Sequence, residues 1–278
     1  MNMRSTLSKM LGKFAVAGTL TLPFLALAQD ESMSSAIDNL ITLGYYVSSI
    51  GYLIATIIMI KAVMVYGKSA FGSIFSYISI GTGIFFIITI FQKLGGDFFK
   101  IGAESMDIWW HVMFYMAIIF YFAGIKLLVA LGGSETENSS IIKIGAEKKW
   151  GAIAVVFLII IFTIPSSVDS IVMIYENSAL GAWGLHHFLS FALAGVVGYY
   201  LVNAKKTLGQ IGHAIATPMI IAIWALCIQH FWELLTESWQ IIELTSDKIE
   251  GVEKIFLTIS AISMCYVGIK LKALAKKG

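Results

Sequence analysis

The chain has 278 residues, of which 58% are hydrophobic and only 13% are charged, and its mean hydropathy is +0.83. A soluble domain carries about 25% charged residues, so this composition excludes a water-soluble globule. It also excludes intrinsic disorder, and a formal net charge of +2 offers no basic face for nucleic acid. Cys227 and Cys265 lie inside apolar runs, without the spacing of a disulfide framework or a zinc finger. We therefore expect an all-α polytopic membrane protein.

Residues 1–28 have the pattern of a secretory signal peptide. Basic residues precede a short apolar stretch, which ends Ala-Leu-Ala at Ala28 and is followed by Gln29. A basic segment, a short apolar segment and a small-residue cleavage site are the three parts of such a signal. We predict cleavage between Ala28 and Gln29, and the alternative is an uncleaved first helix. Residues 29–278 then form a single transmembrane domain in a bacterial inner (cytoplasmic) membrane.

Seven later segments are apolar over the roughly 20 residues that a helix needs to cross a bilayer. They lie near 41–66, 70–91, 109–131, 150–174, 185–204, 213–236 and 255–275. Inside hydrocarbon every backbone polar group must be paired within its own segment, so these runs are predicted to be helices.

Lysines are placed unevenly along these spans. Most of them follow the odd-numbered spans, whereas Lys93, Lys100, Lys248 and Lys254 lie at the opposite ends. Cytoplasmic loops carry an excess of lysine and arginine. The distribution therefore predicts an N-out/C-in orientation, which agrees with the predicted signal peptide.

The odd-numbered spans end in related sequences. These are Met59-Ile60-Lys61, Gly124-Ile125-Lys126, Gly198-Tyr199-Tyr200 and Gly268-Ile269-Lys270. Such self-similarity indicates a repeated two-helix unit, so we predict three hairpin-like units and a final helix. The alternative is that outward-to-inward helices share an apolar body and a basic end for topological reasons alone.

Four histidines are predicted to lie toward the outer ends of their spans: His111, His186, His187 and His230. Imidazoles from two helices could ligate a b-type haem, with His187 and His230 as the preferred pair and His111 as a further candidate. Copper or zinc would also suit neutral imidazole. No two histidines on one helix have metal-site spacing, however. Trp109 and Trp110 before His111 are typical of an interfacial aromatic belt, so an aromatic belt or helix packing is the alternative interpretation of these histidines. We therefore predict no cofactor.

Two acidic residues inside spans, Asp169 and Glu233, are candidates for an ion path, together with Glu176 and Glu237. Ionisable groups within a span are costly and point to function. Both candidates lie within a turn or two of the outer end of their helices, where their side chains could reach water.

Small residues recur along two spans, as Ser190, Ala194 and Gly198 and as Gly44 and Gly51. Such seams let helices approach closely, either within one chain or between subunits. The loops are too short for an independent enzyme domain, which favours a protein that is not an enzyme.

The second two-helix unit carries a resemblance to a known family. Its parts are Tyr121-Phe-Ala-Gly-Ile-Lys126, a polar loop, Gly151-Ala-Ile-Ala-Val-Val and Phe162-Thr-Ile-Pro-Ser-Ser-Val-Asp169. This unit resembles DotE/IcmC- and DotP/IcmD-type membrane proteins of Dot/Icm type IVB secretion and conjugation systems. Span two lacks the Pro-Ser step, and the rest of the chain matches loosely. The resemblance implies an inner-membrane, non-enzymatic part of a machine that exports protein or DNA.

We therefore predict a non-enzymatic integral subunit of a larger envelope assembly, a secretion or conjugation apparatus. Its partners would be the lipid bilayer and other membrane-protein subunits, or further copies of itself, with no direct nucleic-acid binding. One alternative is a redox subunit that holds haem or metal through His111, His187 or His230. Another is a small channel or carrier that uses Asp169 and Glu233.

Overall fold

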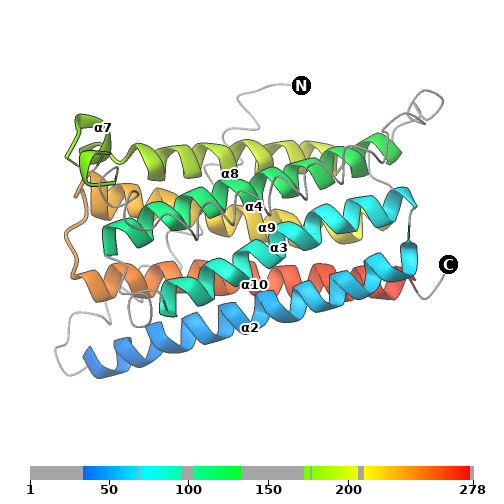
Figure 1. The fold of residues 1–278 in the computed structure, drawn as a ribbon, viewed down its shortest axis with the longest axis horizontal. Helices are drawn as coiled ribbons and strands as arrows, with labels where there is room; N and C mark the ends of the chain where they lie inside the picture. The colour runs from blue at the N-terminus through cyan, green and yellow to red at the C-terminus, as the bar shows by residue number, and fades with distance from the viewer. Residues whose placement is uncertain are drawn as a thin grey trace.

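The computed structural model describes residues 34–67, 69–94, 103–132, 172–175, 177–205 and 210–275. Its long helices are α2 (Ser34–Tyr66), α3 (Ala70–Leu94), α4 (Ala103–Gly132), α8 (Leu185–Ala204), α9 (Gln210–Glu233) and α10 (Ser246–Ala275). The short helix α7 (Ala179–Ala182) precedes α8, and a π-helical turn, η4 (Leu234–Ser238), continues α9 (Figure 1). The predicted signal peptide with Ala28 and Gln29, Asp169, Glu176, and almost all of the span predicted at 150–174 lie outside these ranges.

Six of the described helices are long and apolar enough to cross a membrane, so the chain is a multi-pass membrane protein by length and composition. The first and fifth predicted spans, 41–66 and 185–204, coincide with two of these apolar segments, although α2 itself begins earlier, at Ser34. The last helix begins earlier than predicted, at Ser246 rather than near 255. The first turns of this helix contain charged residues, which lower the local hydropathy and hid its start from the sequence analysis. Glu253 and Lys254 are nevertheless buried there against neighbouring helices.

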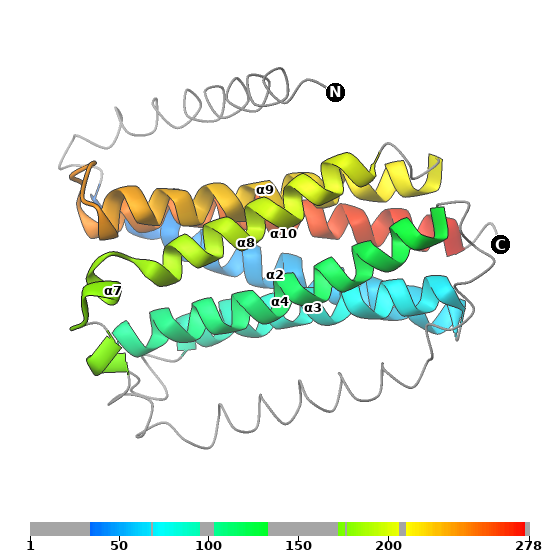
Figure 2. The same cartoon turned by 90° about the horizontal axis from the view of Figure 1, so that it is seen from above.

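The six helices form a closed ring of neighbours. In chain order each long helix packs on the next, and α10 returns to pack on α2. Figures 1 and 2 show the helices side by side along the long axis, with α4 and α8 running in the same direction. Both of these helices begin at the end of the bundle where α9 finishes. That end is called the cluster end below.

Small residues let the ring close. A Cβ added at Gly51 of α2 would lie 3.1 Å from the Cβ of Ala261 on α10, so the two helices touch there. At the same seam the Tyr52 hydroxyl donates a hydrogen bond to Ser260 Oγ at 2.8 Å. Gly198 of α8 similarly faces the Trp224 ring of α9. The predicted small-residue seams therefore pack helices within one chain.

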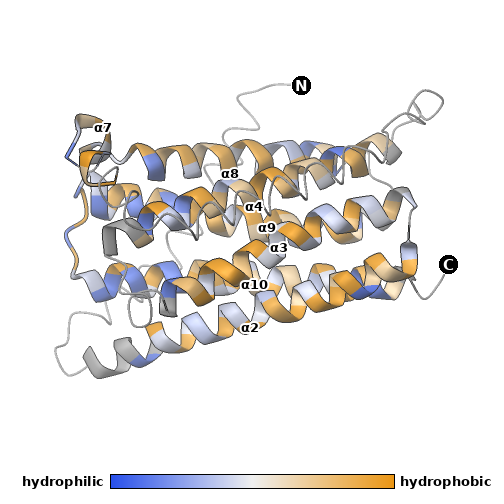
Figure 3. Ribbon diagram, in the orientation of Figure 1, coloured by the Kyte–Doolittle hydropathy of each residue, from blue (hydrophilic) through white to orange (hydrophobic). Residues whose placement is uncertain are grey.

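Aromatic rings fill the space between α2, α3 and α4. Phe85 of α3 stacks on Tyr52 with ring centroids 5.1 Å apart, and Phe114 of α4 meets Phe85 edge-on at 5.9 Å. Phe114 also touches the His230 ring of α9. Isoleucines and leucines are exposed along α2, among them Leu43, Ile50 and Ile57, and the middle of the bundle is mainly hydrophobic (Figure 3). This outer surface suits contact with lipid.

Two glycines on α3 make a matched test of the packing. A Cβ at Gly81 would lie 2.7 Å from the Tyr121 ring and 2.9 Å from the Ala117 carbonyl oxygen, whereas at Gly83 it would lie 3.5 Å from Thr56. Overpacking costs about 1–3 kcal/mol, so we expect Gly81→Ala to lower the midpoint of thermal unfolding in detergent. Gly83→Ala should leave the midpoint unchanged or raise it slightly, and an equal loss in both variants would contradict this packing.

Candidate metal centre

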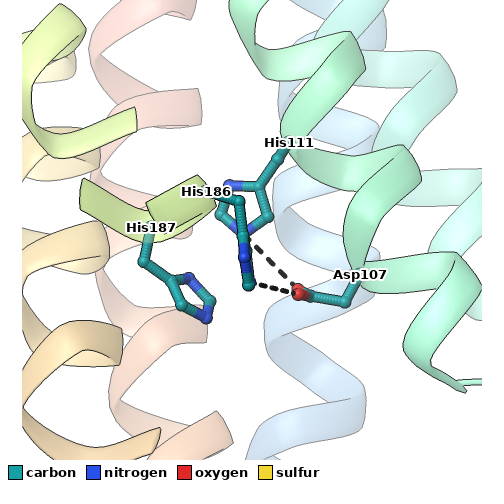
Figure 4. A group of neighbouring side chains, drawn as sticks. All are labelled: Asp107, His111, His186 and His187. Carbon is teal, nitrogen blue, oxygen red and sulfur yellow. Dashed lines mark ion pairs between the residues drawn. The ribbon is translucent and has the colours of Figure 1, made fainter. Parts of the chain in front are cut away.

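Seven polar side chains gather inside the ring at the cluster end. They come from α4, from the start of α8, from the end of α9 and from η4: Asp107, His111, His186, His187, His230, Glu233 and Glu237. Figure 4 shows four of them pointing toward one another from α4 and α8. The fifth histidine, His213, is exposed near the opposite end of α9.

Helix α4 contributes Asp107 and His111, which are four residues apart and therefore share one face. Asp107 Oδ1 lies 3.5 Å from His111 Nε2. The other nitrogen of this ring, Nδ1, shares a hydrogen bond of 2.7 Å with the Ser190 hydroxyl of α8. His111 is only 1% exposed, so its ring is enclosed by the helices, with Nδ1 hydrogen bonded to Ser190 and Nε2 near Asp107.

Helix α8 contributes His186 and His187 from its first turn. The turn starts at Gly184, whose φ of +77° is one that residues with a side chain rarely adopt. A Cβ at Gly184 would lie 2.0 Å from Ser238 Oγ of η4, so only glycine lets α8 begin this close to α9. Side chains of successive residues on a helix point about 100° apart. The imidazoles of His186 and His187 therefore contact different helices.

His186 faces α4, and His187 faces α9. His186 Nε2 lies 3.1 Å from Asp107 Oδ2, and its Nδ1 shares a hydrogen bond of 2.8 Å with the Tyr175 hydroxyl. His187 Nδ1 lies 3.0 Å from Glu233 Oε2, and its Nε2 lies 3.4 Å from Glu237 Oε2. Asp107 therefore joins α4 to α8, and Glu233 joins α8 to α9.

Helix α9 contributes His230 and Glu233 from its last turn. Glu233 Oε2 accepts hydrogen bonds from Nδ1 of both His187 and His230, and Glu233 Oε1 accepts one from Gln229 at 3.0 Å. The π-helical turn then places Glu237 on the far side of His187. Such turns often occur at functional sites. Glu233 is 4% exposed, so its carboxylate depends on these partners.

The four imidazole rings touch one another. Ring centroids are 4.0 Å apart for His186 and His187, 4.7 Å for His111 with each of them, and 5.0 Å for His111 and His230. His111 Nε2 and His230 Nε2 are buried without a hydrogen-bond partner. An unsatisfied buried polar atom costs about 1–3 kcal/mol, and such an atom beside carboxylates is a place for a ligand.

Carboxylates outnumber permanent cations in the cluster. Within the described ranges, Asp107, Glu233 and Glu237 form ion-pair contacts with histidines alone. The Lys254 ammonium lies 3.8 Å from Glu250 instead, and 4.1 Å from the centroid of the Tyr45 ring. Buried charge of one sign needs a counter-charge, which here must come from protonated imidazoles or from a bound cation.

Sequence reasoning identified part of this site and misplaced part of it. The structure brings His111, His187, His230 and Glu233 together as direct neighbours. His111 is buried because α8 covers it, which agrees with the helix-packing interpretation of this residue. The structure corrects the hydrated position expected for Glu233, which is enclosed by His187 and His230.

Two ligand candidates, Asp107 and His186, had not been proposed from the sequence. The available signal was the pairing of one carboxylate with one histidine at helical spacing, as in Asp107 with His111 and His230 with Glu233. From the sequence we considered only pairs of histidines on one helix, and we therefore missed pairs made of one histidine and one carboxylate.

The expected haem pair does not fit this arrangement. Axial ligands bind haem iron from opposite faces of a flat macrocycle. Nδ1 atoms of His187 and His230 instead bond the same oxygen of Glu233, and the His111 ring lies against both imidazoles. The imidazoles of His187 and His230 are therefore too close together for a macrocycle to fit between them. A metal ion without a macrocycle requires much less space.

No known protein family matches the chain, and neither a curated protein nor a solved structure is similar to it.

The glycine at the start of α8 gives a test of how the cluster is assembled. We expect Gly184→Ala to destabilise the protein by about 1–3 kcal/mol, because the left-handed backbone is strained for alanine and the new methyl group displaces Ser238. Thermal unfolding in detergent measures this. Gly195→Ala on the same helix is the control, since its Cβ would meet only Cys227 Sγ at 3.6 Å. Equal stability of the two variants would refute the close approach at Gly184.

Proposed function

We propose that this chain is an integral membrane metalloprotein that binds a first-row transition-metal ion at the cluster end of its helix ring. One observation carries the proposal: two four-residue groups have all their ligand atoms within 4.8 Å of one another. They are Asp107, His111, His186 and His187, and His111, His187, His230 and Glu233. Three helices far apart in the sequence supply these ligands.

The donor set selects the class of metal. Imidazole nitrogens and carboxylate oxygens suit iron, manganese, zinc and copper(II), whereas Cu(I) prefers sulfur. The two cysteines lie elsewhere, with Cys227 Sγ donating to the Phe191 carbonyl and Cys265 Sγ to that of Gly51. Sets of two histidines and one carboxylate leave coordination positions open, so the bound ion could react with a small molecule.

The spacing of the donor atoms suits coordination. Ligands about 2.1 Å from a common ion lie roughly 3.0–3.4 Å from each other. Asp107 lies 3.1 and 3.5 Å from Nε2 of His186 and His111, and Glu233 lies 3.0 Å from His187 Nδ1. These separations need little change when an ion enters.

The surroundings of the imidazoles also support ligation. A ligating histidine usually hydrogen bonds an oxygen through its second nitrogen, which fixes the tautomer and the ring orientation. The second nitrogens of His111 and His186 hydrogen bond Ser190 and Tyr175 in this way, and that of His187 lies 3.4 Å from a Glu237 oxygen.

The distribution of charge supports an outward position for the site. In the described ranges, most lysines, such as Lys126, Lys205 and Lys272, lie toward the end opposite the cluster. The acidic residues lie toward the cluster end, together with Lys93, Lys248 and Lys254. By the positive-inside rule, the lysine end faces the cytoplasm. Asp107 and Glu237, with side chains 40% and 44% exposed, would then admit an ion from outside the cell.

The proposal develops the redox-subunit alternative in a form without haem. The signal peptide, the bacterial inner membrane, the N-out/C-in orientation and the envelope-assembly role all stay predictions. Metal binding is compatible with membership of such an assembly. The ion-path alternative shares Glu233 with the metal site, while Asp169 lies outside the described residues.

Metal content tests the proposal directly. We expect the full-length protein, purified from membranes in mild detergent and treated with no added chelator, to contain iron, manganese, zinc or copper in stoichiometric amount by elemental mass spectrometry. His111→Ala should lower the metal content by at least half, because His111 belongs to both ligand groups.

His213→Ala is the matched control, since this histidine is exposed at the far end of α9. It should retain the metal of the unmodified protein. Because imidazoles must be deprotonated to bind, metal affinity should also fall as the pH is lowered. Protein that holds no stoichiometric metal, as isolated or after incubation with these ions, would overturn the proposal.

Labelling of single cysteines tests the orientation. In a background without Cys227 and Cys265, we expect Asn177→Cys, at an exposed position beside α7, to react with a membrane-impermeant maleimide in intact spheroplasts. Lys272→Cys, exposed at the opposite end, should react only after lysis. The reverse pattern would place the cluster on the cytoplasmic side.

A further inference from the structure

We infer that the cluster holds two metal ions side by side, each in its own set of two histidines and one carboxylate. This inference rests on the proposed metal binding and goes beyond it in the number of ions and in the ligands of each. The two sets are defined here as the α4 triad, which is Asp107, His111 and His186, and the α9 triad, which is Glu233, His187 and His230.

The α4 triad is arranged around one carboxylate. The two oxygens of Asp107 face different imidazoles, Oδ1 toward His111 Nε2 at 3.5 Å and Oδ2 toward His186 Nε2 at 3.1 Å (Figure 4). The other nitrogen of each ring is engaged by Ser190 or Tyr175. Both Nε2 atoms are therefore left for an ion, and Asp107 supplies the oxygen ligand.

The α9 triad repeats this pattern with different residues. One carboxylate, Glu233, faces Nδ1 of both His187 and His230. The second nitrogen of His187 meets Glu237, and the remaining oxygen of Glu233 accepts from Gln229. The second nitrogen of His230 is buried without a partner, so either nitrogen of this ring can bind an ion.

The two triads use each residue once. A single ion bound by either four-residue group would leave the rest of the cluster without a metal. It would leave Glu233 and His230 in the first case, or Asp107 and His186 in the second. Two ions engage both carboxylates and all four imidazoles. His186 and His187 are adjacent with ring centroids 4.0 Å apart, so the two ions would be close neighbours, as in two-metal sites.

Charge balance is also consistent with two ions. Asp107, Glu233 and Glu237 together carry three negative charges when ionised, and among the described residues their ion-pair contacts are with histidines alone. With one divalent ion the net charge is 2 − 3 = −1, which a protonated imidazole would balance, and that imidazole would then no longer bind a metal. With two divalent ions the net charge is 4 − 3 = +1, and one hydroxide ion derived from water would balance it as a bridge between the ions. Uncompensated charge away from water is costly, and an oxygen bridge is the common link between paired ions.

The number of metal ions per chain decides the question. We expect two ions per chain in full-length protein reconstituted with manganese(II) or iron(II) and measured by elemental mass spectrometry against protein mass. Asp107→Asn in the α4 triad and Glu233→Gln in the α9 triad should each reduce this number to about one. These substitutions keep side-chain shape, and His213→Ala should retain two ions.

A second measurement on the unmodified protein needs no variant. Two manganese(II) ions joined by an oxygen bridge give an exchange-coupled electron paramagnetic resonance spectrum, whereas one ion gives an uncoupled six-line signal. The coupled spectrum would support the pair even if a variant failed to fold.

The outcomes separate the two proposals. Absence of bound metal in the unmodified protein overturns metal binding and the pair together. One ion per chain with an uncoupled spectrum leaves metal binding intact and overturns the pair. Loss of both ions in both folded carboxylate variants contradicts the division into two triads.

Discussion

The arrangement depends on one buried carboxylate, that of Glu233 near the end of an apolar helix. Removing a carboxylate from water costs several kcal/mol unless it is paired and hydrogen bonded. Here His187, His230 and Gln229 all donate to it. These contacts require the start of α8 and the end of α9 to lie side by side, and His111 of α4 then packs against the same imidazoles. A polar cluster thus joins three helices whose other contacts are mainly apolar.

The helix ring makes this convergence possible. Gly51 against Ala261 and Gly198 against Trp224 bring neighbouring helices into close contact, so the ring is narrow enough for α4 to reach α9. The backbone at the cluster end departs from ideal helix at two places. Gly184 starts α8 in a left-handed conformation, and the π-helical turn after Glu233 turns Glu237 toward His187. Both departures lie beside the histidines, which is where a functional site is expected to strain the backbone.

The position of the cluster along the bundle indicates what kind of site it is. Transporters bind their substrates near the middle of the membrane, whereas this cluster lies at the ends of its helices and includes two partly exposed carboxylates. These two carboxylates give an ion an approach to the cluster from the end of the bundle. A reactive metal centre near one membrane surface agrees with this position better than a step in a pathway through the membrane.

Local hydropathy and charge in the sequence predicted the membrane class, the approximate positions of the described long helices and the end of the bundle on which four histidines lie. These properties depend on residues that are close together in the chain, so the sequence is enough to predict them. That Asp107, His186 and Glu233 share one site follows instead from the packing of the helices in the tertiary structure. His111 and Ser190 are 79 residues apart, and His187 and Glu233 are 46 apart. Their contact depends on which helices become neighbours, and packing of small residues within the ring sets that order.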